Sequence, residues 1–284
     1  MNFKEAKNYF LRHYLSQDLH EKEAIFYRWI EDWTQKSKLE LLTGAAIDIG
    51  ESKLDIIIER LNKNEPIQHI LGYEWFGHLQ IAVNSSVLIP RPETEELCQW
   101  VCKEAMQLAQ TLNILDIGTG SACIPIYIKS KMPQSNVWAL DYSQKALQVA
   151  QANIDRYDLD ISLLHHDILD STLTLSQSFD ILISNPPYIL PIEKELIANT
   201  VLDYEPHEAL FVSNNDPMQF YKAIAHFSTK HLKPQGAVYV ETHAEHAKEV
   251  LACFEDSFCI VEIRNDMYGK ERFVKAMHKK NKLA

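Results

Sequence analysis

The chain has 284 residues, 46% of them hydrophobic, and a formal net charge of −11 at pH 7. This length allows one large or two smaller domains with a packed core. No apolar stretch approaches the roughly 18 residues of a membrane span. The acidic balance disfavours a nucleic-acid partner, because binding a duplex depends on basic surface. Only Lys279–Lys282 is locally basic, which is typical of a solvated chain end.

Cysteine usage and the N-terminus bear on the compartment. The five cysteines form no CxxC pair, and Met1–Glu5 begins no apolar export signal. Reduced thiols are the simplest account, so we expect a cytoplasmic protein without a metal site. We also expect a monomer with neither a membrane nor a nucleic-acid partner.

Residues 1–72 are predicted to form a small helical domain. Three segments carry apolar residues at helical spacing: Phe3, Phe10, Leu11, Tyr14 and Leu15; Ile25, Phe26, Trp29, Ile30 and Trp33; and Leu54, Ile57, Ile58 and Leu61. Residues 73–88 are predicted to be a β-hairpin linker, with Gly77-His78 as the turn between two short β-like runs.

Residues 89–284 are predicted to form a second, α/β domain. Pro92 and the acidic residues behind it indicate a helix start, and the apolar stretch continues to Ala109. Seven strands are expected, most of them separated by helices, at 113–117, 137–140, 161–164, 181–184, 237–241, 259–263 and 272–276. This alternation predicts a doubly wound, mostly parallel seven-stranded sheet.

A glycine-containing turn follows the first of these strands. Gly118, Thr119, Gly120, Ser121 and Ala122 stand between the strand and a helix expected from Ser121. Glycines let the backbone approach a ligand closely, and a helix start offers free N–H groups. These five residues are therefore candidate cofactor contacts. Cys123 stands where the dinucleotide fingerprint needs its third glycine, which disfavours nicotinamide and flavin cofactors.

Acidic residues end the next two strands. Asp141 comes 23 residues after Gly118 and could accept hydrogen bonds from ribose hydroxyls. At the following strand end, Asp167 could accept from an adenine amine and Ile168 could pack on the ring. The alternatives are a helix N-cap for Asp141 and plain loop structure for Asp167 and Ile168.

Asn185-Pro186-Pro187-Tyr188 follows the apolar run Phe179–Ser184, which is typical of a buried parallel strand. The prolines stiffen the loop and hold Asn185 extended at the strand end, where α/β sheets bind ligands. The Asn185 side-chain oxygen and the Pro186 carbonyl could accept both hydrogens of a planar –NH2 group, and Tyr188 could supply a flat wall. The alternative for Tyr188 is packing of the loop onto the domain.

Together these features resemble the class I S-adenosylmethionine methyltransferases, specifically the HemK/PrmC family. The resemblance covers nearly the whole chain and includes the segments 65–72, 89–95 and 204–211. It implies a methyltransferase domain behind a helical N-terminal domain joined by a β-hairpin. It also implies S-adenosyl-L-methionine as cofactor and transfer of its methyl group to the glutamine side-chain nitrogen of class 1 peptide chain release factors.

Residue roles follow from the same resemblance. Gly118–Ala122, Asp141, Ile168 and Asn185 would touch the cofactor, and Asn185–Tyr188 would hold the glutamine of a Gly-Gly-Gln tripeptide. Asn185, Pro186 and Tyr188 would be the catalytic residues.

Three positions depart from the pattern of the family. Family loops often have glycine at the position of Ala122, where alanine permits the turn if φ stays negative. Some relatives have tryptophan at Ile168, and many have glycine at His243, a change without a physical account.

Other interpretations stay open. Adenine-N6 methylation of DNA or RNA uses a similar loop on a planar amine, and ribosomal-protein glutamine methyltransferases are the nearest alternative within amide methylation. A binding module without turnover and a nicotinamide oxidoreductase are two further alternatives. Arg91, Glu93, Glu205 and His207 could line a peptide channel or serve structure alone.

Overall fold

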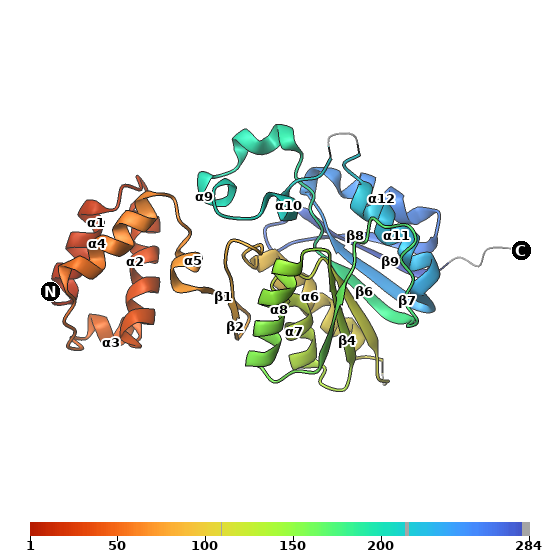
Figure 1. Cartoon of the computed structure of the whole chain (residues 1–284), viewed down its shortest axis with the longest axis horizontal. Coiled ribbons are helices and arrows are strands. Elements are labelled where there is room, and N and C mark those ends of the chain that lie inside the picture. Colours follow the sequence, from red (N-terminus) through yellow and green to blue (C-terminus); the bar gives the residue numbers. More distant parts are fainter. Residues whose placement is uncertain (109, 214–215, 280–284) are drawn as a thin grey trace, which may run out of the picture. The chain divides into compact units, whose positions relative to one another are not determined.

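The computed structural model describes residues 1–108, 110–213 and 216–279. The predicted helix end at Ala109 and residues 280–282 of the predicted basic segment lie outside them. The described residues form two compact units (Figure 1). One contains Met1–Tyr73 together with Ile197–Tyr204, and the other contains Glu74–Leu196 and the described residues from Glu205 onward.

The first unit is helical. Its helices are α1 (Phe3–His13), α2 (Leu19–Thr34), α3 (Lys38–Leu42), α4 (Glu51–Asn62), α5 (Ile67–Leu71) and α9 (Asn199–Leu202). Phe10, Phe26 and Leu54 are fully buried in its core, in agreement with the predicted apolar faces. The placement of Leu15 in that face was wrong. Helix α1 ends at His13, and the Leu15 side chain is 72% exposed.

Segment 197–204 joins this unit although it is distant in sequence. The Tyr204 hydroxyl donates to the Lys63 carbonyl at 2.9 Å, and its ring lies edge-on to His69. The predicted linear boundaries did not contain this association.

The second unit is built on a mixed, mostly parallel sheet, as predicted. Its strands are β3 (Asn113–Ile117), β4 (Asn136–Asp141), β5 (Ile161–His165), β6 (Phe179–Ser184), β7 (Leu232–Glu241), β8 (Phe258–Asn265) and β9 (Glu271–Lys279). They follow the order β5-β4-β3-β6-β7-β9-β8, in which β3 to β7 are parallel and β9 is antiparallel to both its neighbours. The strand order reverses between β3 and β6, which is where open α/β sheets bind ligands.

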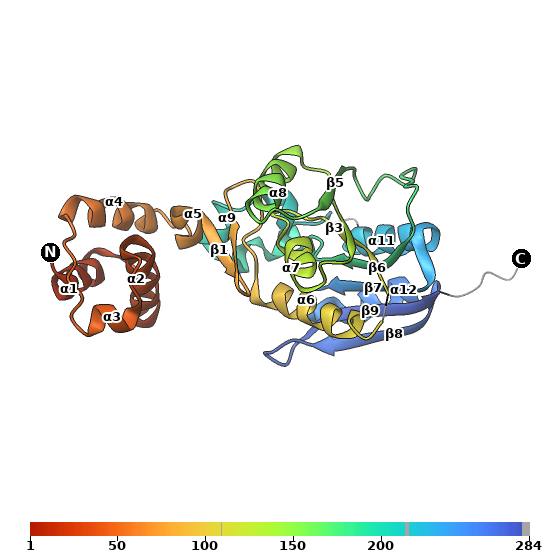
Figure 2. The ribbon, with the colours of Figure 1, turned by 90° about the horizontal axis from the view of Figure 1, so that it is seen from below.

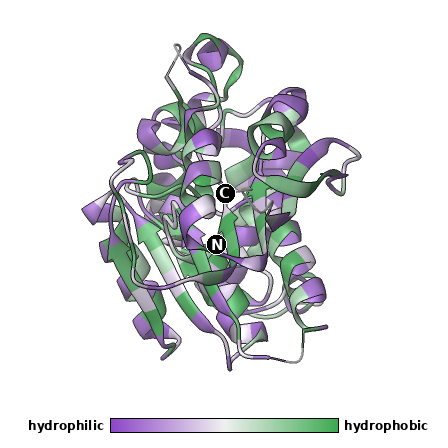
Figure 3. Ribbon diagram, turned by 90° about the vertical axis from the view of Figure 1, so that its right-hand side faces the viewer, coloured by the Kyte–Doolittle hydropathy of each residue, from purple (hydrophilic) through white to green (hydrophobic). Residues whose placement is uncertain are grey.

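Helices cover both faces of this sheet (Figures 1 and 2). On one face lie α6 (Pro92–Ala105), α7 (Cys123–Lys131) and α8 (Gln144–Arg156), and on the other lie α11 (Gln219–His231) and α12 (Ala247–Glu255). In Figure 3 the strands are mostly hydrophobic and the helices carry both kinds of residue, as expected for a sheet buried between two helical layers. No helix among the described residues has both the length and the apolarity needed to cross a membrane.

The predicted hairpin, β1 (Tyr73–Phe76) and β2 (Leu79–Ala82), forms a two-stranded sheet. Phe76 and Ile81 are buried in the core beside α6 and α7. The Asn153 side chain of α8 both donates to and accepts from the backbone of Ala82. The second strand of the hairpin is therefore fixed to the sheet unit.

Short elements connect the strands near the reversal point. They are η1 (Pro191–Leu196), α10 (His207–Leu210) and η2 (Ala244–His246). The Ser184 hydroxyl donates to the Ile117 carbonyl at 2.6 Å, which ties the ends of β6 and β3 together. The two loops that follow these strands are thus held close to each other.

Candidate functional site

A cavity opens where β3, β4 and β6 end. Ten of the predicted site residues line it: Gly118, Thr119, Gly120, Ser121, Asp141, Asp167, Ile168, Asn185, Pro186 and Pro187. Ala122 and Tyr188 are not among the lining residues. The structure thus brings together residues that are up to about 70 positions apart, in the order predicted from the strand ends.

The glycine turn is held by backbone hydrogen bonds. The N–H groups of Gly118 and Thr119 donate to the Leu140 carbonyl at 2.8 and 3.0 Å. Gly118 and Gly120 have φ of +76° and +53°, and a Cβ added at either would meet no atom within 4 Å. Glycine is therefore favoured here by the backbone angles, and both glycines line the cavity.

Ala122 departs from what was expected. Its φ is +63°, in the left-handed region, so the condition under which alanine was expected to permit the turn is not met. The residue precedes α7 as its N-cap, and its side chain is fully buried in the core. Alanine pays a steric cost in this conformation that glycine avoids.

Asp141 holds the glycine turn as well as lining the cavity. Its two carboxylate oxygens accept from the backbone N–H of Gly120 at 2.8 Å and of Ser143 at 2.9 Å. Burial raises the pKa of this carboxyl, and the same N–H groups oppose the shift. The N-cap of α8 is Ser143, whose side chain accepts from Ala146, so the alternative role of Asp141 as that cap is wrong.

Asp167 and Ile168 lie in the loop after β5. One oxygen of Asp167 accepts from the Leu169 N–H at 2.9 Å, and Ile168 packs beside the core under α11. Both also line the cavity. The two residues therefore form loop structure, as one alternative held, and contact with a ligand in the cavity stays a prediction for both.

The loop after β6 presents Asn185 to the cavity. The Asn185 Nδ2 donates to the Thr94 hydroxyl at 2.9 Å, so the opposite end of the amide is its Oδ1. The Tyr188 hydroxyl donates at 3.4 Å to Oε1 of Glu241, outside the cavity lining. Burial raises the pKa of the Tyr188 phenol far above its usual range. The geometry thus supports the alternative in which Tyr188 secures the loop.

The four undecided polar residues lie at or next to the starts of α6 and α10. Arg91 pairs with Glu205 at 2.5 Å, and the same carboxylate accepts from the Ile89 N–H at 3.0 Å. Glu93 stands in the first turn of α6, and His207 begins α10. Since Glu205 is buried, its pairing fixes the chain segment ahead of α6.

His243 lies beside the Tyr188 ring, with 6.1 Å between the ring centroids. Its Nε2 is 3.8 Å from Glu193 of η1. Burial lowers the pKa of this imidazole, and the Glu193 charge opposes the shift. The histidine therefore lies between the Tyr188 end of the Asn185–Tyr188 loop and Glu193 of η1.

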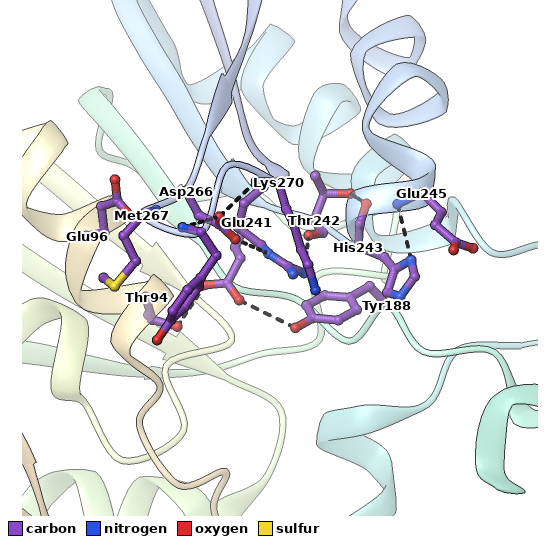
Figure 4. Close-up of polar contacts among 12 residues, drawn as sticks. Thr94, Glu96, Tyr188, Glu241, Thr242, His243, Glu245, Asp266, Met267 and Lys270 are labelled. Carbon is purple, nitrogen blue, oxygen red and sulfur yellow. Dashed lines mark hydrogen bonds and ion pairs between the residues drawn. The ribbon is translucent and has the colours of Figure 1, made fainter. Parts of the chain in front are cut away.

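Three buried polar residues of this region were not predicted: Thr94, which lines the cavity, and Glu241 and Asp116, which do not. The Thr94 hydroxyl accepts from Asn185 and donates to Oε2 of Glu241, whose other oxygen accepts from Tyr188. Figure 4 shows Thr94, Glu241 and Tyr188. Asp116 of β3 is fully buried, and neither of its oxygens has a hydrogen-bond partner among the described residues. Burial raises its pKa to about 7, and the nearby Thr119 hydroxyl opposes the shift. The one signal in the sequence that could have indicated these three residues was a polar side chain inside a strand or helix face predicted to be buried.

Comparison with known proteins indicates the family. Residues 101–203 match the model of the methyltransferase small domain. A release factor glutamine methyltransferase of Flavobacterium psychrophilum is 39% identical over 91% of this chain and 92% of its own length. One of Lactococcus lactis is 35% identical over 92% of this chain and 96% of its own length.

Solved structures agree on the fold. A methyltransferase from Pyrococcus furiosus matches with a TM-score of 0.51 and 16% identity over 79% of this chain and 98% of that one. The catalytic domain of hMettl16 in complex with an RNA hairpin matches with a TM-score of 0.53 and 17% identity, over 72% and 77% of the two chains. At these identities the likeness concerns the fold alone.

Proposed function

The chain belongs to the family of release factor glutamine methyltransferases, and from this premise we propose its reaction. It transfers a methyl group from S-adenosylmethionine to the side-chain nitrogen (N5) of the glutamine in the Gly-Gly-Gln motif of class 1 release factors. The observation that carries the proposal is the position of Asn185 and Pro186 in the cavity that the glycine turn also lines.

The residues present fit such a cofactor. Gly118 and Gly120 expose their backbone to open space, as a turn that lies against a ligand requires. Asp141 lines the cavity and keeps acceptor capacity for ribose hydroxyls beyond its two backbone bonds. Asp167 and Ile168 would bound the adenine end. When bound, S-adenosylmethionine supplies an electrophilic methyl group carried on a positively charged sulfur.

The protein's own contribution is to orient a poor nucleophile. The lone pair of an amide nitrogen is delocalised into the carbonyl. Oδ1 of Asn185 and the carbonyl of Pro186 would each accept one N–H of the glutamine amide, which directs the remaining lone-pair lobe of its nitrogen. These contacts strengthen as positive charge develops on nitrogen, so they favour the transition state over the ground state.

Stiffness of the loop supports this role. Pro186 and Pro187 fix φ, and no cis peptide bond occurs among the described residues. Beyond Tyr188, the Ile189 N–H donates to the Leu210 carbonyl at 3.0 Å and the Val212 N–H donates to the Ile189 carbonyl at 2.9 Å, which anchors the loop's far end. A preformed pair of acceptors needs no reorganisation during the reaction. A strong general base is not required, because the methylated nitrogen is acidic enough to lose its proton late.

Mass spectrometry of treated release factor tests the proposal. The protein and S-adenosylmethionine are incubated with a class 1 release factor, and the Gly-Gly-Gln peptide is expected to gain the mass of one methylene group on glutamine. Parallel incubations with DNA, RNA and ribosomal proteins test the alternative substrates. Methyl transfer to one of these and not to the release factor would contradict the proposal.

We also propose a cytoplasmic monomer that binds no nucleic acid. All five cysteines are free, which is typical of a reducing compartment. The net charge of −11 opposes binding to phosphate backbones. Light scattering of the purified protein, alone and with RNA, measures its oligomeric state and whether it binds RNA.

A further inference from the structure

A chain of hydrogen bonds connects the candidate site to a buried carboxylate. Asn185 Nδ2 donates to Thr94 Oγ1 at 2.9 Å, and Thr94 Oγ1 donates to Glu241 Oε2 at 2.7 Å. The three residues come from the end of β6, the first turn of α6 and the end of β7. Thr94 and Glu241 are 3% and 1% exposed, so water does not compete for these bonds.

The number of hydrogens on each group fixes which group donates in the two hydrogen bonds between Asn185, Thr94 and Glu241. The Thr94 hydroxyl has a single hydrogen, and an ionised carboxylate can only accept. The hydroxyl hydrogen therefore goes to Glu241, and the hydroxyl oxygen can then only accept from its other neighbour. Only the –NH2 end of the Asn185 amide can serve as that donor. The opposite end, Oδ1, is left to face the cavity.

We propose that Thr94 and Glu241 are positioning residues for glutamine methylation, which set the Asn185 amide so that its oxygen receives the substrate N–H. The proposal rests on the function proposed above. Without the carboxylate, the Thr94 hydroxyl can donate to Oδ1 of Asn185 instead. The Asn185 –NH2 group would then face the substrate –NH2 group, and two donors would oppose each other.

The surroundings of Glu241 agree with this role. Tyr188 donates to its second carboxylate oxygen, and the Tyr221 hydroxyl donates to its backbone carbonyl at 3.0 Å (Figure 4 shows Thr94, Tyr188 and Glu241). Burial raises the pKa of Glu241 to about 7, the Thr94 bond and the Arg272 charge oppose the shift, and the Glu93 charge adds to it. The carboxylate thus holds both ends of the Asn185–Tyr188 loop, most firmly above pH 7.

Substitutions at Thr94 separate the hydroxyl from the shape of the side chain. Thr94→Val keeps the volume and removes the hydroxyl, whereas Thr94→Ser keeps the hydroxyl. We expect Thr94→Val to lower kcat on release factor about tenfold or more, the size of one lost buried hydrogen bond. Thr94→Ser should keep kcat within about threefold. Affinity for S-adenosylhomocysteine, measured by calorimetry, should change less than about threefold in both.

Glu241→Gln supplies an independent readout. An amide can donate as well as accept, so the Thr94 hydroxyl is no longer forced to donate toward residue 241 and to accept from Asn185. The wild-type kcat is expected to rise with pH through about 7, as Glu241 ionises, and the Glu241→Gln variant should lack this rise. Thermal melting of each variant, with and without S-adenosylhomocysteine, checks that the fold is retained.

The outcomes separate the two proposals. A wild-type protein that leaves release factor unmethylated overturns the proposed function and, with it, the positioning role. An active wild type with an equally active Thr94→Val overturns the positioning role alone. So does a Thr94→Ser variant as impaired as Thr94→Val, or a Glu241→Gln variant that keeps the wild-type pH profile.

Discussion

Residues 118–122 and residues 185–188 follow neighbouring parallel strands, and 118–121 and 185–187 line one cavity, yet the two loops keep their shapes by different means. In the first loop, Gly118, Gly120 and Ala122 have positive φ, and backbone bonds close the turn. In the second, two prolines restrict φ, and side chains from distant elements hold Asn185 and Tyr188. The loop that presents backbone is held by backbone hydrogen bonds and by one carboxylate, Asp141, on a backbone N–H, whereas the loop that presents an amide oxygen needs the orientation of that side chain enforced.

Each loop also has a buried carboxyl behind it. Glu241 receives donors from Thr94 and Tyr188, whereas neither oxygen of Asp116 has a partner among the described residues. Burial raises the pKa of both groups to about 7. Two carboxyls with similarly raised pKa values therefore have different expected functions. Glu241 orients a side chain, whereas Asp116 makes the stability of the fold depend on pH.

The largest effect is expected in the loop that presents side chains. Asn185→Ala removes one of two acceptors for the substrate amide and should lower kcat about 10²-fold or more, by analogy with losing one oxyanion-hole donor. Single-turnover methylation of release factor at saturating cofactor measures it. Asn185→Asp, which keeps an acceptor oxygen, is the matched variant. A near-normal kcat in purified Asn185→Ala would contradict the role given to this loop.

In the backbone loop, Gly120→Ala should weaken cofactor binding. A left-handed φ costs an L-residue about 1–2 kcal/mol, and the methyl group would be added to a residue that lines the cavity, so we expect about tenfold lower affinity or more. Gly44→Ala is the control, because Gly44 also has positive φ and open space but lies in the helical unit. Equal affinities for S-adenosylhomocysteine in the two variants would show that the turn does not bind the cofactor.

Asp116→Asn tests the carboxyl that has no hydrogen-bond partner. In the unfolded chain an aspartate ionises near pH 4, whereas in the folded protein Asp116 ionises near pH 7. Between these values the folded state holds more protons, so this group lowers stability as pH rises, by at most about 1.4 kcal/mol per pH unit. The stability of Asp116→Asn relative to wild type should therefore increase from pH 5 to 7 and level off above. Urea unfolding at each pH measures the difference, and a pH-independent difference would contradict the assignment.

The smallest effect is expected for Ala122→Gly. Relief of the left-handed conformation contributes about 1–2 kcal/mol, but glycine raises the entropy of the unfolded chain by about 0.4–1 kcal/mol and removes a buried methyl group worth about 0.8 kcal/mol. The terms nearly cancel, so the free energy of unfolding should change by less than about 1 kcal/mol. Stabilisation by more than about 2 kcal/mol in urea unfolding would show that the strain at Ala122 is larger than its φ suggests.

Local patterns in the sequence were sufficient for the architecture. The alternation of apolar strands and amphipathic helices predicted the sheet, because each pattern depends on neighbouring residues alone. The parallel order placed the glycine turn, Asp141 and Asn185 at one edge, since the carboxyl ends of parallel strands meet there. Ten cavity-lining residues were foreseen on this basis.

Features that depend on contacts between distant segments were decided by the tertiary structure. Thr94 is 91 residues from Asn185 and 147 from Glu241, and no local periodicity encodes such a pairing. The association of 197–204 with the helical unit, the exposure of Leu15 and the direction of Tyr188 are of the same kind. Sequence periodicity specifies which face of an element is apolar, whereas packing specifies what that face meets.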